Sequence, residues 1–115
     1  MKTQPSAQSL NAYVASKIDL PQEIVFELFK KFIANTYILL PQFDGYNDDP
    51  ETLKMTIHSL KGIAKNLFLD TLGTMCEAFE TDLNTLTFEQ KTQRLYELKK
   101  ETLRTVDKMR GELPE

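Results

Sequence analysis

Apolar residues recur three and four positions apart in four long stretches of the chain, and turn-forming residues separate these stretches. Residues at this spacing share one face of a helix, so each stretch predicts an amphipathic helix with one buried side. The first two buried sides comprise Ile24, Val25, Leu28, Phe29, Phe32, Ile33, Thr36, Tyr37 and Leu40, and then Leu53, Thr56, Ile57, Leu60, Ile63, Ala64 and Leu67. The other two comprise Leu72, Met75, Cys76, Phe79, Leu83 and Leu86, and then Leu95, Leu98, Thr102, Val106 and Met109. With no strand pattern of any weight, the chain predicts an all-α fold, an antiparallel up-down four-helix bundle with a short extra N-terminal helix.

Local signals place the ends of the first two predicted helices. Ser9 can cap a short helix that continues to about Ile18. Asp19 and Gln22 resemble a capping box for the long helix that follows. Pro41 clashes with the carbonyl four residues before it, so it should kink or end that helix.

The third helix has a clear start. Residues 42–49 form a turn cluster, and Asp49 followed by Pro50 predicts a capped helix start. The helix is expected to run to about Phe68 or Leu69. Similar signals open the last two helices: Asp70 is a candidate cap, and Thr87 with Gln90 resembles a capping box.

Length and composition predict one globular domain. The chain has 115 residues, of which 41% are hydrophobic and 27% are charged, which is enough for a single core. Residues 1–8 are polar and contain a proline, so they are expected to form a flexible lead-in. Residues 9–115 then form the bundle domain.

Charge and hydropathy argue against several kinds of partner. A net charge of −3 provides no general basic surface for nucleic acid. The longest purely apolar run, residues 38–40, is far shorter than a membrane span, and the first six residues lack the apolar segment of a secretory signal. We therefore expect a cytoplasmic protein that binds neither nucleic acid nor membranes.

Cysteine, histidine and glycine usage argue against a bound cofactor. Cys76 and His58 are the only residues of their types, so neither an intramolecular disulfide nor a structural zinc site is expected. The four glycines are too scattered to form a phosphate-binding loop. Cys76 is expected to act as a small buried hydrophobe.

His58 lies on the polar side of the third predicted helix, opposite the buried stripe. The same side carries Lys61, Gly62 and Lys65, with Lys54, Met55 and Leu69 beside them. A glycine inside a helix costs about 1 kcal/mol relative to alanine, so Gly62 predicts a compensating benefit: it clears the surface for another protein to approach Nε2 of His58. A neutral imidazole is nucleophilic near neutral pH, and a nearby lysine favours a phosphoryl group. The pattern predicts a site that carries a phosphoryl group without a catalytic apparatus.

These residues resemble the histidine phosphotransfer (HPt) domains of two-component phosphorelays. The motif of that family is His, any residue, Leu, Lys, Gly, then usually Ser or Ala, with small residues and a Leu-Gly following. In this chain, the motif is matched by His58, Leu60, Lys61, Gly62, Ala64 and Leu67. Further along, Leu72, Cys76 and Glu80 stand where the family tends to have an apolar, a small and a polar residue. The resemblance covers about residues 20–113. It is broken at Ile63, where a small residue is usual, and at Phe68, where glycine usually follows the leucine.

The resemblance implies a phosphoryl carrier and not an enzyme. A receiver domain carrying phospho-aspartate would dock over His58, and Nε2 would attack the phosphoryl group in line. The phosphohistidine would later pass this group to the aspartate of another receiver. Mg²⁺ is expected on the receiver, and a monomer is the simplest expectation for this chain.

The resemblance also suggests roles for the residues around His58. Lys61 would steady the phosphoryl oxygens, with Lys65 as a longer-range helper, and Gly62 would give clearance. Glu80 would orient the imidazole by accepting a hydrogen bond from its N–H, although a solvated carboxylate is the alternative. The partner-docking surface would comprise Lys54, Met55, Ile63, Phe68 and Leu69.

Two other functions stay open at this point. The chain is also similar to the substrate-histidine domain of a chemotaxis-type kinase, which an ATP-binding domain phosphorylates. A non-phosphorylated helical adaptor is the second alternative, although a pure scaffold would need neither His58, Lys61 nor Gly62. The donor that labels His58 would separate these functions.

Overall fold

The computed structural model describes residues 9–48 and 50–114, with the backbone alone for residues 45–48. Within them lie five α-helices: α1 (Leu10–Ile18), α2 (Gln22–Leu39), α3 (Pro50–Asn66), α4 (Asp70–Asp82) and α5 (Phe88–Glu112). Two 3₁₀ segments, η2 (Leu40–Asp48) and η3 (Leu83–Thr85), follow α2 and α4. No strand occurs among these residues, which confirms the predicted all-α fold. The predicted lead-in of residues 1–8 and the cap at Asp49 lie outside the described residues.

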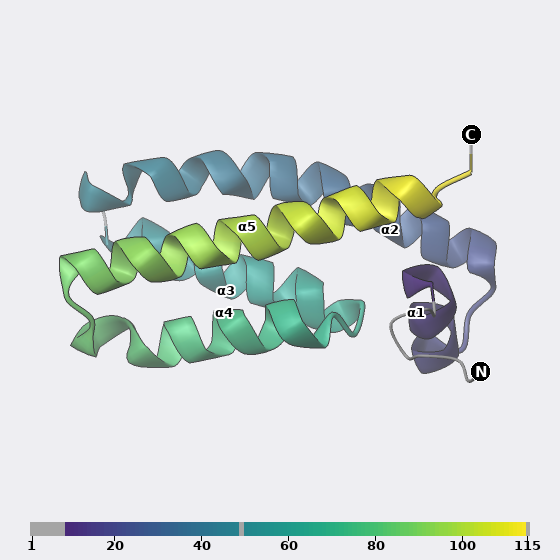
Figure 1. Cartoon of the computed structure of the whole chain (residues 1–115), viewed down its shortest axis with the longest axis horizontal. Coiled ribbons are helices and arrows are strands. Elements are labelled where there is room, and N and C mark those ends of the chain that lie inside the picture. The colour runs from purple at the N-terminus through teal and green to yellow at the C-terminus, as the bar shows by residue number, and fades with distance from the viewer. Residues whose placement is uncertain (1–8, 49, 115) are drawn as a thin grey trace, which may run out of the picture.

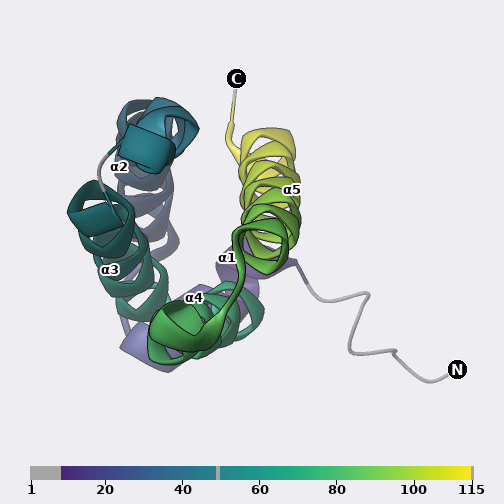
Figure 2. The same ribbon diagram turned by 90° about the vertical axis from the view of Figure 1, so that its left-hand side faces the viewer.

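The four longer helices lie along the longest axis of the molecule (Figure 1). The short helix α1 lies at the end where α2 begins and α5 ends. Viewed from the opposite end, α2 to α5 are arranged around a common interior, with α3 beside α2 and α4 (Figure 2). The chain therefore forms a helical bundle with α1 against one end.

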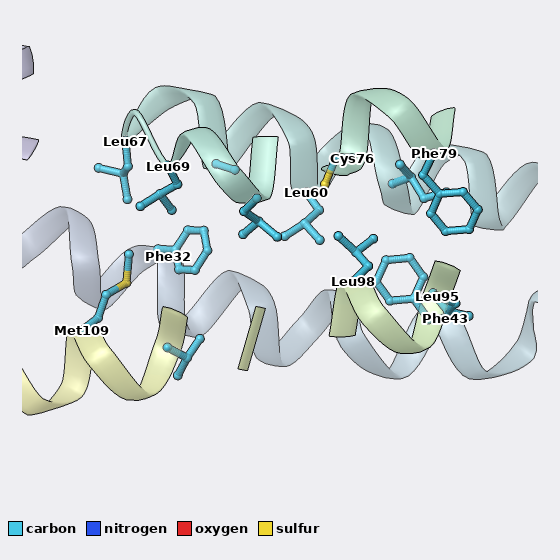
Figure 3. Close-up of a cluster of buried hydrophobic side chains, with 14 of the residues drawn as sticks. Phe32, Phe43, Leu60, Leu67, Leu69, Cys76, Phe79, Leu95, Leu98 and Met109 are labelled. Atoms are coloured by element: carbon cyan, nitrogen blue, oxygen red, sulfur yellow. The ribbon is translucent and has the colours of Figure 1, made fainter. Parts of the chain in front are cut away.

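One hydrophobic core holds the helices together. Figure 3 shows Phe32 of α2, Leu60 of α3, Cys76 and Phe79 of α4 and Leu98 of α5 gathered in it. The predicted inner residues of α5 are all buried. The buried residues of α2 are Val25, Phe29, Phe32 and Thr36. Ile24 and Tyr37, at the edges of the predicted apolar side, are exposed. A packed interior of this kind fixes how each helix is rotated about its own axis.

Two sets of hydrogen bonds hold the N-terminus of the first helix. Ser9 caps it as predicted, because its hydroxyl accepts a hydrogen bond from the N–H of Ala12. The carboxylate of Glu112 accepts hydrogen bonds from the backbone N–H groups of Leu10 and Asn11, at 2.8 and 2.7 Å. The last residue of the chain's longest helix thus binds the N-terminus of its first.

The predicted capping box at Asp19 and Gln22 is wrong. Asp19 instead ends α1 in the left-handed conformation, with φ of 57°, and its N–H donates to the carbonyl of Ala15. Pro21 occupies the N-cap position of α2 and forms no side-chain cap. The Gln22 side chain donates to the side-chain oxygen of Asn11. The tertiary packing of α1 against α2 therefore replaces a local capping interaction.

Pro41 has the predicted effect on α2, whose α-helical turns end at Leu39. The chain then continues as the 3₁₀ segment η2, where a turn cluster was predicted. Phe43 is completely buried and anchors this segment to the core. Burial of this ring stabilises the position of the segment on the bundle.

The third helix ends earlier than predicted, at Asn66. The N–H of Leu69 donates to the carbonyl of Ala64 and that of Phe68 to Lys65, the pattern of a Schellman motif. Phe68 occupies the left-handed position of this motif, with φ of 56°. This turn carries the chain away from the helical path and directs Leu69 into the core.

The starts of the last two helices give one wrong and one confirmed prediction. Asp70 is the first residue of α4 and not its cap, and its carboxylate accepts a hydrogen bond from the hydroxyl of Tyr13 at 2.7 Å. Thr87 and Gln90 form the predicted capping box, with both of its hydrogen bonds present. Local sequence therefore decides the start of α5, whereas the turn after α3 decides that of α4.

Candidate functional site

His58 lies in the middle of α3 and points away from the core. Ile57 and Leu60, on either side of it in sequence, are completely buried, while 67% of the His58 side chain is exposed. The helix continues for two turns on both sides of His58. The imidazole is therefore exposed on a rigid support, as the helical phase predicts.

Glu80 of α4 reaches across to His58. Its Oε2 lies 3.1 Å from Nδ1 of the imidazole, and its Oε1 accepts a hydrogen bond from Nζ of Lys61 at 2.7 Å. Both Glu80 and Lys61 are about one-fifth exposed. The predicted contact between Glu80 and the imidazole is thus present, and Lys61 takes part in the same cluster.

The charges of Glu80 and Lys61 stabilise each other. The hydrogen bond from Lys61 holds the pKa of the Glu80 carboxyl below its usual value; burial opposes this effect and the contact with His58 adds to it. The same hydrogen bond raises the pKa of Lys61, against the effect of burial. Both groups are therefore ionised near neutral pH.

An ionised carboxylate can only accept hydrogen bonds. A neutral His58 that pairs with Glu80 must therefore carry its proton on Nδ1. The lone pair is then on Nε2, on the side of the ring away from Glu80. The arrangement therefore favours the tautomer in which Nε2 carries the lone pair.

Gly62 leaves open space beside His58. A Cβ placed on Gly62 would meet no heavy atom within 4 Å beyond its own helix. Internal packing therefore does not require glycine here, and neither does the backbone, whose φ is negative. The absence of a side chain affects only the outer surface, one helical turn after His58.

Lys65 lies on the predicted side of α3 but pairs with a different residue. Its Nζ lies 3.3 Å from Oε1 of Glu77, and its aliphatic stem covers Gly73. This pairing with Glu77 was not predicted from the sequence. The signal that was available is the spacing of Glu77 and Glu80, which puts both carboxylates on the face of α4 beside α3.

Two of the five residues predicted to dock a partner are not placed beside His58. Leu69 is only 7% exposed and belongs to the core, because the chain leaves the helical path after Asn66. Ile63 is half-buried and packs against the core on the side of α3 that faces α2. The expected exposure of Leu69 is wrong, because its side chain is buried in the core. Ile63 keeps part of its side chain exposed, so its docking role stays a prediction.

The other three predicted docking residues are exposed. Lys54 and Met55 lie one turn before His58, and Met55 is among the most exposed apolar residues of the described chain. Phe68 is partly exposed but lies beyond the end of α3, in the left-handed turn that follows it. Lys54 and Met55 therefore form the part of the predicted surface that adjoins the imidazole.

Cys76 lies in the core behind the site. Burial, together with the charge of Glu80, raises the pKa of its thiol to about 12. It is therefore a neutral thiol at physiological pH, in agreement with its predicted structural role.

Comparisons of the chain with protein-family models, with curated proteins and with solved structures found no match. Among the described residues, no group of three or more His, Cys, Asp or Glu side chains could hold a metal ion. The described helices also include none with the length and hydropathy needed to cross a membrane.

Proposed function

We propose that this chain is an HPt-like phosphoryl carrier that accepts a phosphoryl group on Nε2 of His58 and passes it to another protein. The observation that carries the proposal is the contact of 3.1 Å between Nδ1 of His58 and Oε2 of Glu80. It leaves the nucleophilic nitrogen exposed on a rigid helix, beside the open surface at Gly62. The motif that resembles HPt domains supports the same function.

The transfer begins with neutral His58. The Nε2 lone pair attacks the phosphorus of a phospho-aspartate, a new N–P bond forms, and the P–O bond to the aspartate breaks and releases its carboxylate. The ring keeps the proton on Nδ1 and becomes positively charged. The Glu80 carboxylate stabilises that charge, and the reverse reaction regenerates the neutral ring.

Lys61 supports this reaction in a way that differs from the sequence-based expectation. Its ammonium is bound by Glu80 and is therefore partly neutralised before a phosphoryl group arrives. Positioning Glu80 is one role that this pairing supports, and contact with a phosphoryl oxygen requires Lys61 to rotate. The partner is expected to supply Mg²⁺ as the principal positive charge.

We also propose how the helices are arranged, in which compartment the protein acts and which partner it binds. The proposed arrangement of α2 to α5 is an antiparallel up-down four-helix bundle; short connections between successive helices along one axis support it. The proposed setting is cytoplasmic. The partner is a receiver domain, the chain acts as a monomer without catalytic activity of its own, and neither nucleic acid nor a membrane is bound.

The decisive experiment is labelling by purified receiver domains that carry radioactive phospho-aspartate, in the presence of Mg²⁺. Acid-labile, base-stable phosphate should appear on the wild-type chain and map to His58. The variant His58→Gln should take up none, while its melting temperature should stay close to that of the wild type because the side chain is exposed. Labelling of His58→Gln would refute the site.

A second candidate is the substrate domain of an ATP-dependent histidine kinase, because the geometry at Nε2 suits either donor. Labelling by a kinase catalytic domain with ATP, without labelling by any receiver, would favour this function. If neither donor labels His58, the helical adaptor would be the remaining function.

A further inference from the structure

A hollow of about 370 Å³ lies between the first turns of α3, the segment η3 and the first turns of α5. Figure 1 shows these elements at one end of the molecule. Leu53 and Leu83 contribute its apolar part, and Phe88 lies at its edge. Phe88 is 60% exposed.

The hollow continues the inner side of α5 beyond the core. Phe88, Lys91, Leu95 and Leu98 follow one another at helical spacing on a single face of α5. Leu95 and Leu98 are buried, whereas most of the Phe88 side chain is exposed. The face that packs the bundle interior therefore continues to the exposed ring of Phe88, which lines the hollow.

Positive charge predominates among the described side chains around this hollow. Lys54 and Lys91 line it, and Glu51 is the one carboxylate with them. Neither lysine forms an ion pair or a hydrogen bond within the described chain, in contrast to Lys61 and Lys65. A group that enters the hollow would thus meet two available ammonium groups next to an aromatic ring.

The hollow is continuous with the surface around His58. Lys54 precedes His58 by four residues, so the two side chains are neighbours on the outer face of α3. A protein that covers His58 would also cover Lys54, and the hollow begins there. Interfaces of standard size bury about 800 Å² on each partner, which is ample to include both.

We propose that this hollow is the second contact point for the protein that exchanges phosphoryl groups with His58, and that it receives an apolar side chain flanked by carboxylates. The inference rests on the proposed function. Phe88 and Leu83 bind the apolar group, while Lys54 and Lys91 bind the carboxylates. The partner surface is therefore acidic next to its phosphoryl-bearing residue, and the contact sets affinity and not the chemistry at Nε2.

The test measures the rate of His58 labelling against the concentration of a receiver domain that labels the wild-type chain. Phe88→Ala and Lys91→Glu should each raise the half-saturating concentration about tenfold, as expected for a residue that contacts the partner directly. The rate at saturation should change much less. For the wild type, the half-saturating concentration should also rise with salt, and for Lys91→Glu it should rise less steeply.

The same helix offers matched controls. Tyr96 is 58% exposed on the outer side of α5, and Lys100 lies over its ring. Tyr96→Ala therefore removes an exposed aromatic ring, and Lys100→Glu reverses a lysine charge, both outside the hollow. These controls should change the half-saturating concentration less than twofold. Phosphoramidate, a small phosphoryl donor that needs no docking surface, gives the intrinsic reactivity of His58 in each variant.

The outcomes separate the two proposals. If the receiver labels the wild type, the hollow variants and the controls with the same half-saturating concentration, the hollow is not a contact and the phosphoryl carrier stands. If the hollow variants lose labelling by phosphoramidate to the same extent, the substitutions damage the site itself, and the docking inference is overturned. If neither a receiver nor a kinase labels the wild-type chain, both proposals fail.

Discussion

Glu80 on α4 and His58 on α3 are 22 residues apart in sequence, and their side chains meet with Oε2 3.1 Å from Nδ1. The second oxygen of Glu80 binds Lys61. One carboxylate therefore holds both a potential nucleophile and the nearest lysine, and its position depends on how α4 packs against α3. The packing of the bundle thereby controls the state of the imidazole.

Replacement of Glu80 by Ala should release the imidazole. In the wild type, ¹⁵N NMR of the neutral ring should show the proton on Nδ1, and in Glu80→Ala the ring should shift toward the tautomer protonated on Nε2. Labelling of His58 should slow about tenfold, the equivalent of about 1.4 kcal/mol and within the range of one charge-assisted hydrogen bond. The matched control is Glu77→Ala, which removes a carboxylate from the same face of α4 without touching His58. An unchanged tautomer in Glu80→Ala would contradict the positioning role.

Gly62→Ala should make the protein more stable. The new Cβ meets open space, and alanine is favoured over glycine in a helix by about 1 kcal/mol. Urea denaturation should therefore give a free energy of unfolding higher by about that amount. Gly62→Gln should also fold but should block labelling by a receiver, because its longer side chain covers the approach to Nε2. A loss of stability in Gly62→Ala would show that Gly62 has a structural role.

At position 68, glycine should give a more stable protein than alanine, the reverse of what is expected at an ordinary helical position. The φ of 56° at Phe68 costs a residue with a Cβ about 1 kcal/mol or more. Phe68→Gly and Phe68→Ala remove the same ring, so their difference in unfolding free energy reports the backbone conformation alone. We expect Phe68→Gly to be the more stable by about 1 kcal/mol. At the exposed helical position Ala78, substitution by glycine should instead lower stability.

The contact between Glu112 and the start of α1 should make stability depend on pH. Burial alone would raise the pKa of the Glu112 carboxyl, but the hydrogen bonds from the N–H groups of Leu10 and Asn11 outweigh burial and lower it. A carboxyl whose pKa is lower in the folded state stabilises the protein above its unfolded pKa, and this contribution is lost as the pH falls through the folded value. Glu112→Gln should therefore be less stable than the wild type at pH 7, by about 1–2 kcal/mol. The difference should shrink as the pH falls below about 4.

The control for this experiment is Asp107→Asn on the exposed side of the same helix. It should leave both the stability and its pH dependence close to those of the wild type. A constant difference between Glu112→Gln and the wild type from pH 7 to pH 3 would exclude the linkage.

Cys76 should resist thiol reagents while the protein is folded. With a pKa of about 12, only about one thiol in ten thousand is ionised at pH 8, and the side chain is buried. A disulfide reagent should thus react only in denaturant. Rapid reaction under native conditions would indicate local opening of α4.

The sequence by itself determined the helices and the outward direction of His58. Helical periodicity is a local property, so the inner faces of α3, α4 and α5 could be identified without knowing their neighbours. The capping box at Thr87 and Gln90 was predictable for the same reason, since its hydrogen bonds join residues three apart.

Only the tertiary structure decided the end of α3 and the contacts made across helices. Leu69 is buried because the left-handed turn at Phe68 redirects the chain, and helical phase cannot be extrapolated through such a turn. The separation of neighbouring helices likewise decides that Lys65 pairs with Glu77 and that the hollow forms beside Phe88. Local sequence fixes backbone conformation over a few residues, whereas the position of one helix on another follows from the packing of the whole core.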